Sequence, residues 1–211
     1  MFTQITTEYA NKVVAADREQ VPKYLEVLHQ MAKILCRVTH NYVPKAIAPH
    51  LEAILPLLLT VLEKLLDENY TGVEGSWKVC KRLLLLLTQT FLGRCRQPYA
   101  SHTPKFIQVA WQGLKPPSHG QRSPDVVLSL CLMALTRAVE VGGQPRGNVV
   151  DLIDQASFLS HIFPLLCLRS SDRDLWMEDP DEYLALNLEM DLEGVIEAAA
   201  SMKEDRTSGR Q

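Results

Sequence analysis

Aromatic residues are scarce in this sequence, and sustained strand-like alternation is absent from it. Aromatics make up 7% of the 211 residues, whereas hydrophobic residues as a whole make up 46%. That hydrophobic share is too large for a disordered chain. No alternation of polar and apolar residues continues for more than a few positions, as it would in half-buried strands. The abundance of Leu, Ala and Val instead favours helices, because such side chains lose little conformational freedom in a helix.

The sequence also lacks the motifs of an enzyme or a metal site. It contains no GxGxxG phosphate loop, no GxSxG and no HExxH or HxxH spacing. Its five cysteines form no CxxC pair and lie apart in apolar stretches, as expected for reduced thiols of an intracellular protein; they are Cys36, Cys80, Cys95, Cys131 and Cys167. We therefore predict no catalytic residue, no cofactor and no metal ion.

No segment predicts a contact with a membrane or with nucleic acid. The first residues lack the basic and apolar regions of a signal peptide. The most apolar run, Leu83–Leu87, lies between charged and polar residues and is far shorter than the roughly 18 residues of a membrane span. A net charge of −3 is mild and does not suggest binding to nucleic acid or to a membrane surface.

Helical periodicity runs through most of the chain. Apolar residues recur at intervals of three and four, the spacing of one face of a helix, in three rows: Tyr24, Leu28, Met31, Leu35 and Val38; Leu51, Leu55, Leu58, Leu62 and Leu65; and Leu152, Ala156, Leu159, Phe163 and Leu166. In the second row, apolar neighbours fill further faces, which predicts a helix covered on most sides. Another dense helix is expected over residues 76–96.

Proline and glycine divide the helices from one another. Pro22 suits a first helical turn, and Thr103 before Pro104 is a candidate N-cap. That helix is expected to end near Leu114, and the next to run from Ser123 to Gly142. Residues 69–75, 115–120 and 144–148 are predicted loops. The result is six or seven helices of about 15–20 residues each.

Antiparallel helices joined by short loops form hairpins, and a hairpin period of about 40–50 residues is that of HEAT and armadillo arrays. We therefore predict an all-α fold, an α-solenoid of HEAT-like helical hairpins. A compact helical bundle is the competing architecture.

The charge is concentrated near the C-terminal end. Residues 172–205 carry 12 acidic side chains and two basic ones, a local net charge of −10. Since the whole chain carries −3, the rest of it carries +7. We interpret the acidic segment as a charged surface, because no apolar pocket is evident that would separate the pKa values of its carboxylates.

One segment resembles a known family. It runs from Ile162 through a Phe-Pro-Leu helix to Ser170 and then reads SSDRDLWMEDPDEY up to Tyr183. The large importins of the importin-β (karyopherin-β) family, the importin seven, eight, nine and eleven group, have a similar Phe-Pro-Leu helix. In that group a W-x-x-D-P-x-x-Y motif and an acidic stretch follow it. Trp176, Asp179, Pro180 and Tyr183 match the motif.

The resemblance implies a segment of a nuclear import receptor with a right-handed superhelix. Its implied partners are Ran-GTP, nucleoporins and basic cargo of the histone or ribosomal-protein type, and its implied locations are the cytoplasm, the nucleus and the nuclear pore. The alternative is a HEAT-repeat scaffold subunit of a complex that does not take part in nuclear transport. Members of the family are several times longer, so we expect a fragment. The candidate protein-binding residues are Trp176, Glu178, Asp179, Pro180, Asp181, Glu182 and Tyr183.

The predicted organisation has three parts. HEAT-like repeats occupy residues 1–171, and the acidic segment with its W-x-x-D-P-x-x-Y motif occupies residues 172–205. Residues 206–211 resemble the start of a further repeat. In the motif, Pro180 is expected to stop a short helix, and Trp176 and Tyr183 to clamp the turn against the array.

Overall fold

The structure is a computed structural model that describes residues 2–40, 42–93, 96–116, 123–153, 160–166 and 170–182. The chain forms two compact units, Met1–Ile162 and Phe163–Gln211, and each is considered by itself. The described residues contain helices and no strand. The all-α prediction is therefore confirmed.

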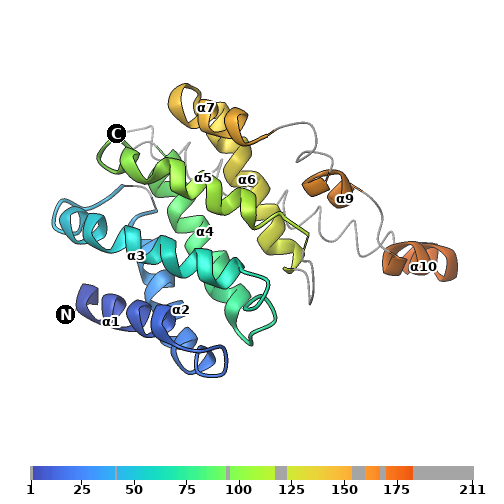
Figure 1. The fold of residues 1–211 in the computed structure, drawn as a ribbon, viewed down its shortest axis with the longest axis horizontal. Coiled ribbons are helices and arrows are strands. Elements are labelled where there is room, and N and C mark those ends of the chain that lie inside the picture. Colours follow the sequence, from blue (N-terminus) through green and yellow to red (C-terminus); the bar gives the residue numbers. More distant parts are fainter. Residues whose placement is uncertain are drawn as a thin grey trace, which may run out of the picture. The chain divides into compact units, whose positions relative to one another are not determined.

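Seven α-helices and one 3₁₀-helix lie in the described part of the first unit: α1 (Phe2–Ala15), α2 (Pro22–Val38), α3 (Ala48–Leu66), α4 (Ser76–Leu92), η1 (Gln97–His102), α5 (Thr103–Gln112), α6 (Asp125–Val141) and α7 (Gly143–Leu152). Each odd-numbered helix up to α5 packs on the helix that follows it. The odd-numbered helices lie side by side in one layer and α2, α4 and α6 in the other (Figure 1). This is the two-layered stacking of hairpins that the periodicity predicts.

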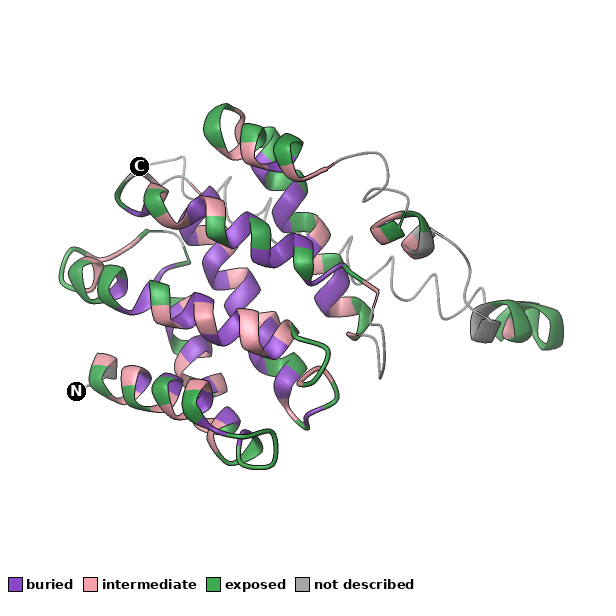
Figure 2. Cartoon of the chain, in the orientation of Figure 1, coloured by how far each residue is buried: buried purple, intermediate pink, exposed green. Residues whose placement is uncertain are grey.

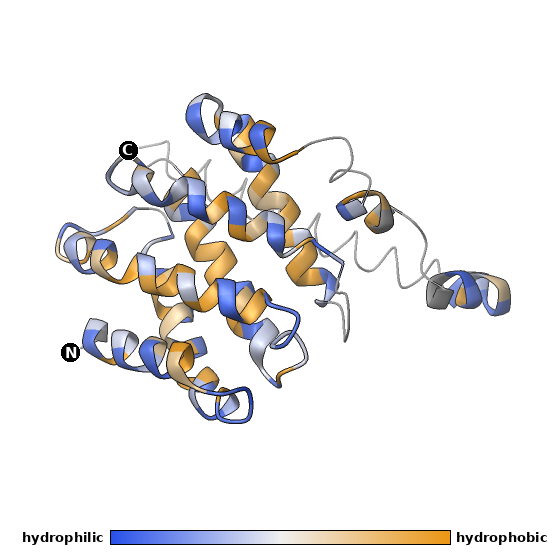
Figure 3. Cartoon of the chain, in the orientation of Figure 1, coloured by the Kyte–Doolittle hydropathy of each residue, from blue (hydrophilic) through white to orange (hydrophobic). Residues whose placement is uncertain are grey.

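The core is deepest in α3 and α4. Every residue of the predicted row on α3 is 0–1% exposed: Leu51, Leu55, Leu58, Leu62 and Leu65. Ile54, Leu59 and Val61 are buried as well, so α3 is covered on most sides, as predicted. The apolar residues of α4 and α6 continue this core (Figures 2 and 3). Helices with neighbours on two sides need apolar residues on several faces.

Two of the five residues in the predicted row on α2 are buried. Leu28 and Leu35 are buried, but the other core residues of α2 are Leu25 and Ala32. Tyr24 and Met31 are partly exposed, and Val38 is 37% exposed. The chain thus has two apolar rows on α2, and the sequence pattern alone did not separate them.

Several helix boundaries also differ from the predictions. Residues 144–148 belong to α7 and do not form a loop. Pro145 fits there, because the first-turn N–H groups of a helix have no intrahelical acceptor. The break before α7 comes instead from Gly142 and Gly143, whose φ values of 71° and 60° favour glycine. Thr103 is itself helical and buried, and His102 is the N-cap of α5.

Polar side chains join successive hairpins at corresponding places. The Lys64 ammonium of α3 donates to the carbonyl oxygens of Val14 and Ala16 at the end of α1, at 2.9 and 2.6 Å. The Gln89 amide of α4 likewise donates to the carbonyl oxygens of Thr39 and His40 at the end of α2. Both donors lie about one repeat further along the chain than their acceptors. These contacts fix the register of one hairpin on the next.

The second unit contains α9 (Phe163–Leu166) and α10 (Ser170–Glu178) among its described residues, with a further helical turn at residues 180–182. The third predicted apolar row is divided by this organisation. Leu152 ends α7 and Phe163 begins α9, whereas Ala156 and Leu159 lie outside the described residues. None of the described helices is long and apolar enough to cross a membrane.

Candidate protein-binding segment

The candidate residues lie at the end of α10 and in the turn after it. Trp176 and Glu178 belong to α10, Asp179 interrupts the helix, and Pro180 to Glu182 form the next helical turn. Tyr183, the last residue of the W-x-x-D-P-x-x-Y motif, lies outside the described residues. The predicted clamp between Trp176 and Tyr183 is therefore still a prediction.

Asp179 ends one helix and begins the next. Its backbone N–H donates to the carbonyl oxygen of Leu175 at 2.7 Å, which closes the last turn of α10. Its carboxylate accepts the backbone N–H of Glu182 at 2.9 Å. That bond is the one an N-cap makes to the third residue of a helix, and Pro180 occupies the favoured first position.

The prediction that a short helix stops at Pro180 is confirmed, because α10 ends at Glu178, just before it. Pro180 also begins the next helical turn, which was not predicted. An aspartate followed by proline and, three positions on, by glutamate is the signature of a helix start. This signature is present in the sequence and identifies the turn correctly.

The segment is an open, charged surface. Trp176 is 45% exposed and Met177 is 76% exposed. All residues from Glu178 to Glu182 are exposed. Arg173 is the one cation described in this segment, and its nearest approach to Asp174 is 3.8 Å, with both side chains largely exposed. Such a pair neutralises little of the acidic charge. The segment thus presents an aromatic side chain, a thioether and four carboxylates to solvent.

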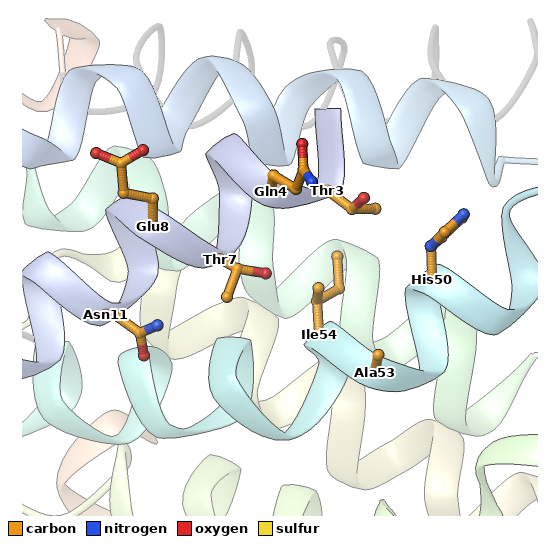
Figure 4. Close-up of a pocket in the computed structure, with 8 residues that line it drawn as sticks. All are labelled: Thr3, Gln4, Thr7, Glu8, Asn11, His50, Ala53 and Ile54. Atoms are coloured by element: carbon orange, nitrogen blue, oxygen red, sulfur yellow. The ribbon is translucent and has the colours of Figure 1, made fainter. Parts of the chain in front are cut away.

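A second candidate is the shallow groove between α1 and α3 (Figure 4). It has a volume of about 400 Å³ and is lined by Thr3, Gln4, Thr7, Glu8, Asn11, His50, Ala53 and Ile54. The Glu8 carboxylate is already paired with the Lys12 ammonium at 2.5 Å. Besides Glu8, the lining offers hydroxyl and amide groups, the His50 imidazole and the apolar side chains of Ala53 and Ile54 on an open surface. No helix is predicted before Pro22 from the sequence, so the groove, of which α1 forms one wall, could not be predicted either.

Of the described cysteines, Cys80 and Cys131 are buried and Cys36 is partly exposed, and the pKa of each thiol is raised. Burial raises the pKa of the Cys36 thiol to about 11 and that of Cys131 to about 12, and it raises the pKa of Cys80 further. A protonated thiol is neither a nucleophile nor a metal ligand. Cys95 and Cys167 lie outside the described residues. Within the described ranges, no group of three His, Cys, Asp or Glu side chains is placed to hold a metal ion.

Comparison with known proteins identifies the chain. A family model described as Cse1 matches residues 1–200. This chain belongs to the Cse1 family. No curated protein and no solved structure matches it.

Membership of the Cse1 family places the chain in the importin-β superfamily of HEAT-repeat α-solenoids. The predicted solenoid is thereby confirmed over the competing bundle. The family consists of karyopherin-β transport receptors, which are not catalytic, bind Ran-GTP and move between nucleus and cytoplasm. The karyopherin resemblance is therefore confirmed, although Cse1 itself is an exportin and not an importin.

Proposed function

We propose that this chain is part of a nuclear transport receptor that binds Ran-GTP and carries protein cargo. The observation that carries the proposal is the Cse1 match, which extends over the helical array and into the acidic segment. The hairpins of the first unit supply a scaffold with large surfaces on both layers, as protein-binding solenoids do. Nucleoporins, as partners at the pore, belong to the same proposal.

The cargo that suits the acidic segment is a basic protein of the histone or ribosomal-protein type. The acidic residues from Glu178 to Glu182 are exposed, so their charge acts through solvent and is screened by salt. Attraction of this kind raises the rate of encounter more than it raises affinity. Trp176, Pro180 and Tyr183 then supply apolar contact area beside the charge.

The direction of transport has two candidates. The W-x-x-D-P-x-x-Y motif, shared with the large-importin group, favours import into the nucleus, whereas the Cse1 match favours export. Import and export receptors differ in whether the binding of Ran-GTP weakens or strengthens the binding of cargo. An import receptor releases its cargo when Ran-GTP binds, whereas an export receptor binds its cargo together with Ran-GTP. Because the coupling between two ligands is reciprocal, it can be measured from either side.

The test is binding of the 211-residue chain to Ran loaded with a non-hydrolysable GTP analogue, with GDP-loaded Ran as the control. Selective binding of the GTP form supports the proposal. Equal or absent binding of both forms, with the chain folded by circular dichroism, contradicts Ran binding by this segment and favours a HEAT scaffold outside transport. The Ran titration is then repeated with a histone present. Weaker Ran-GTP binding in the presence of the histone would indicate an import receptor, and stronger binding would indicate an export receptor.

A second experiment tests the acidic segment alone. The variant E178Q/D181N/E182Q removes three exposed carboxylates, and D17N/E19Q removes two exposed carboxylates from the first unit as a control. We expect histone affinity to fall several-fold in the first variant and little in the second. We also expect affinity to fall as salt is raised, because the attraction is screened. Affinity that does not change with ionic strength would contradict this role.

A further inference from the structure

The middle of the chain carries positive charge with no negative charge next to it in the sequence. Residues 76–124 contain eight basic residues and no acidic one, so their local net charge is +8. Since the whole chain carries −3, the rest of it carries −11. The eight residues are Lys78, Lys81, Arg82, Arg94, Arg96, Lys105, Lys115 and Arg122.

Three of these cations lie on the side of α4 that faces away from the core. Lys78 is exposed, and Lys81 and Arg82 are partly exposed, whereas ten residues on the other sides of α4 are buried. Leu85 continues the same side of the helix one turn further on, and it is also partly exposed. Helix α4 packs on α2 and α6 in its own layer and on α3 in the other (Figure 1). The cations therefore lie on the outer surface of the layer formed by α2, α4 and α6.

Two cations of α2 lie beside the same surface. The Cys36 thiol of α2 donates to the backbone carbonyl oxygen of Arg82 at 3.2 Å. Burial raises the pKa of that thiol to about 11, and the Arg82 guanidinium partly offsets the effect, so this guanidinium lies close to α2. Lys33 and Arg37 lie three residues before and one residue after Cys36, and neither is buried. We refer to Lys33, Arg37, Lys78, Lys81 and Arg82 as the basic cluster.

None of the described ion pairs neutralises the basic cluster. These pairs involve other cations, which are Lys12, Lys105, Arg137 and Arg173. Along the chain, the acidic residues nearest to the cluster are Glu26, two turns before Lys33 on α2, and Glu74, which precedes α4. On the neighbouring α6, the Glu140 carboxylate is paired with a guanidinium of that helix at 3.0 Å. The cluster thus keeps a net positive charge.

The basic cluster does not belong to the surfaces through which repeats stack. In a helical array each repeat contacts the repeats before and after it, and α2 and α6 flank α4 on those two sides. A further repeat at either end would pack against the hairpin of α2 or that of α6 and would leave the outer surface of α4 open. The exposure of the cluster therefore does not depend on where the sequence begins or ends.

The side chains around the cluster indicate the chemistry of its partner. Lysine and arginine attract carboxylates and phosphates alike. Proteins that bind single-stranded nucleic acid present several aromatic side chains on which successive bases stack. Here Trp77 is the one exposed aromatic residue of α2 and α4, and its ring centre lies 5.8 Å from the Lys78 ammonium. With Leu85 among the cations, the surface fits a protein segment better than a nucleic acid strand.

We propose that the basic cluster binds an acidic segment of a protein partner, in which Asp or Glu residues alternate with apolar residues. The carboxylates of the partner pair with the lysines and arginines of the cluster, and its apolar side chains pack on Leu85, Trp77 and the lysine stems. This partner is opposite in charge to the basic cargo proposed for the acidic segment. The proposal does not depend on the binding of Ran or of that cargo.

The test uses a synthetic peptide in which pairs of Glu alternate with Leu. A second peptide carries Gln in place of each Glu, and a third probe is an oligouridine of the same length. Fluorescence anisotropy measures the binding of each probe to the full chain. We expect the Glu peptide to bind at least about ten-fold more tightly than the Gln peptide, and the difference to shrink at high salt.

Two variants locate the binding surface. K78Q/K81Q removes two charges from the basic cluster and is expected to weaken binding of the Glu peptide about five-fold. K105Q/K115Q is the matched control, because it removes two charges from the same stretch of sequence, one on α5 and one just after it, in the other layer. It is expected to leave binding unchanged. None of these four side chains is buried, so both variants should fold, which thermal unfolding followed by circular dichroism checks.

Four outcomes would overturn the proposal. Equal affinity for the Glu and Gln peptides would contradict an acidic partner. Equal losses in the two variants would show that only the net charge of the chain matters. Tighter binding of the oligouridine than of the Glu peptide would make a nucleic acid the ligand. Binding of the Glu peptide to E178Q/D181N/E182Q but not to the wild-type chain would make the acidic segment of this chain the occupant.

Discussion

The ammonium group of Lys64 lies 2.6 Å from the backbone carbonyl oxygen of Ala16 and 2.9 Å from that of Val14. The last carbonyl groups of a helix have no intrahelical donor and carry the negative end of the helix dipole. The Lys64 ammonium, from the next hairpin, donates hydrogen bonds to these carbonyl groups and also places a positive charge at the negative end of the helix dipole. The Lys64 ammonium also lies 4.7 Å from the centre of the Tyr70 ring, which holds it in place. One side chain of the second hairpin thus completes the first helix of the chain.

Replacing Lys64 by Met should destabilise the first hairpin. Methionine retains most of the apolar stem but leaves the Val14 and Ala16 carbonyls without their donor. We expect a loss of about 1.5–3 kcal/mol in the free energy of unfolding, the range for hydrogen bonds to charged groups. Urea unfolding followed by circular dichroism measures it. Lys105→Met is the control, since Lys105 pairs with Glu63 at 2.9 Å on an exposed surface, where such pairs contribute at most about 1 kcal/mol. Equal losses in both variants would contradict the capping role.

The buried thiols should make the fold sensitive to alkaline pH. Burial raises the pKa of Cys131 to about 12 and that of Cys36 to about 11, against about 8.5 in an unfolded chain. Between these values the native state keeps protons that the unfolded state has lost. Stability is therefore complete below about pH 8.5 and falls as the pH rises towards the native pKa values.

Cys131→Ala should reduce this pH dependence. The variant loses stability at neutral pH because it opens a cavity in α6, but it no longer has a thiol to titrate. We expect the urea midpoint to fall less between about pH 7.5 and about pH 10 than it does in the wild type. Val127→Ala, at a site equally buried in α6, is the control and should keep the wild-type pH dependence. Identical slopes in Cys131→Ala and wild type would show that this thiol does not contribute.

The two tryptophans Trp111 and Trp176 should differ in their contributions to stability. Trp111 is 6% exposed and its ring lies 4.9 Å from that of His161, whereas Trp176 is 45% exposed. We expect Trp111→Ala to cost about 3–5 kcal/mol, the range for buried aromatic residues. Trp176→Ala should cost much less, because its side chain is already half in water. Thermal unfolding of both variants makes the comparison. A large loss in Trp176→Ala would support the predicted clamp with Tyr183 instead.

The inner helices could be predicted closely from the sequence. The row from Leu51 to Leu65 is buried throughout, because α3 has neighbours on several sides. The hairpin stacking follows from the same periodicity. In contrast, the close neighbours of α2 in the described part of the chain are α1 and α4, and periodicity does not show which of its apolar faces they cover. Tyr24, Met31 and Val38 were assigned to the core for that reason.

The other differences between the predicted and the observed helix boundaries come from residues that fit two kinds of local structure. Pro145 reads as a loop residue but fits the first turn of α7, and the glycine pair before it sets the break. Pro180 follows the end of α10, as predicted, and it also begins the next helical turn, which Asp179 caps. Of the candidate protein-binding residues, the sequence predicted the exposed acidic character correctly. It could not predict the groove between α1 and α3, because no helix was predicted before Pro22 and α1 forms one wall of the groove.

Asp179 offers the sharpest local test of the candidate segment. Asp179→Ala removes the carboxylate that accepts the Glu182 N–H at 2.9 Å, so the turn at residues 180–182 loses its cap. Loss of an N-cap costs about 1 kcal/mol, which corresponds to about a five-fold rise in the opening equilibrium. Amide hydrogen exchange at Glu182, followed by NMR, should accelerate by that factor. Asp181→Asn is the control, because Asp181 is exposed in the same turn but its side chain does not act as the cap. Equal acceleration in the two variants would mean that loss of acidic charge, and not loss of the cap, opens the turn.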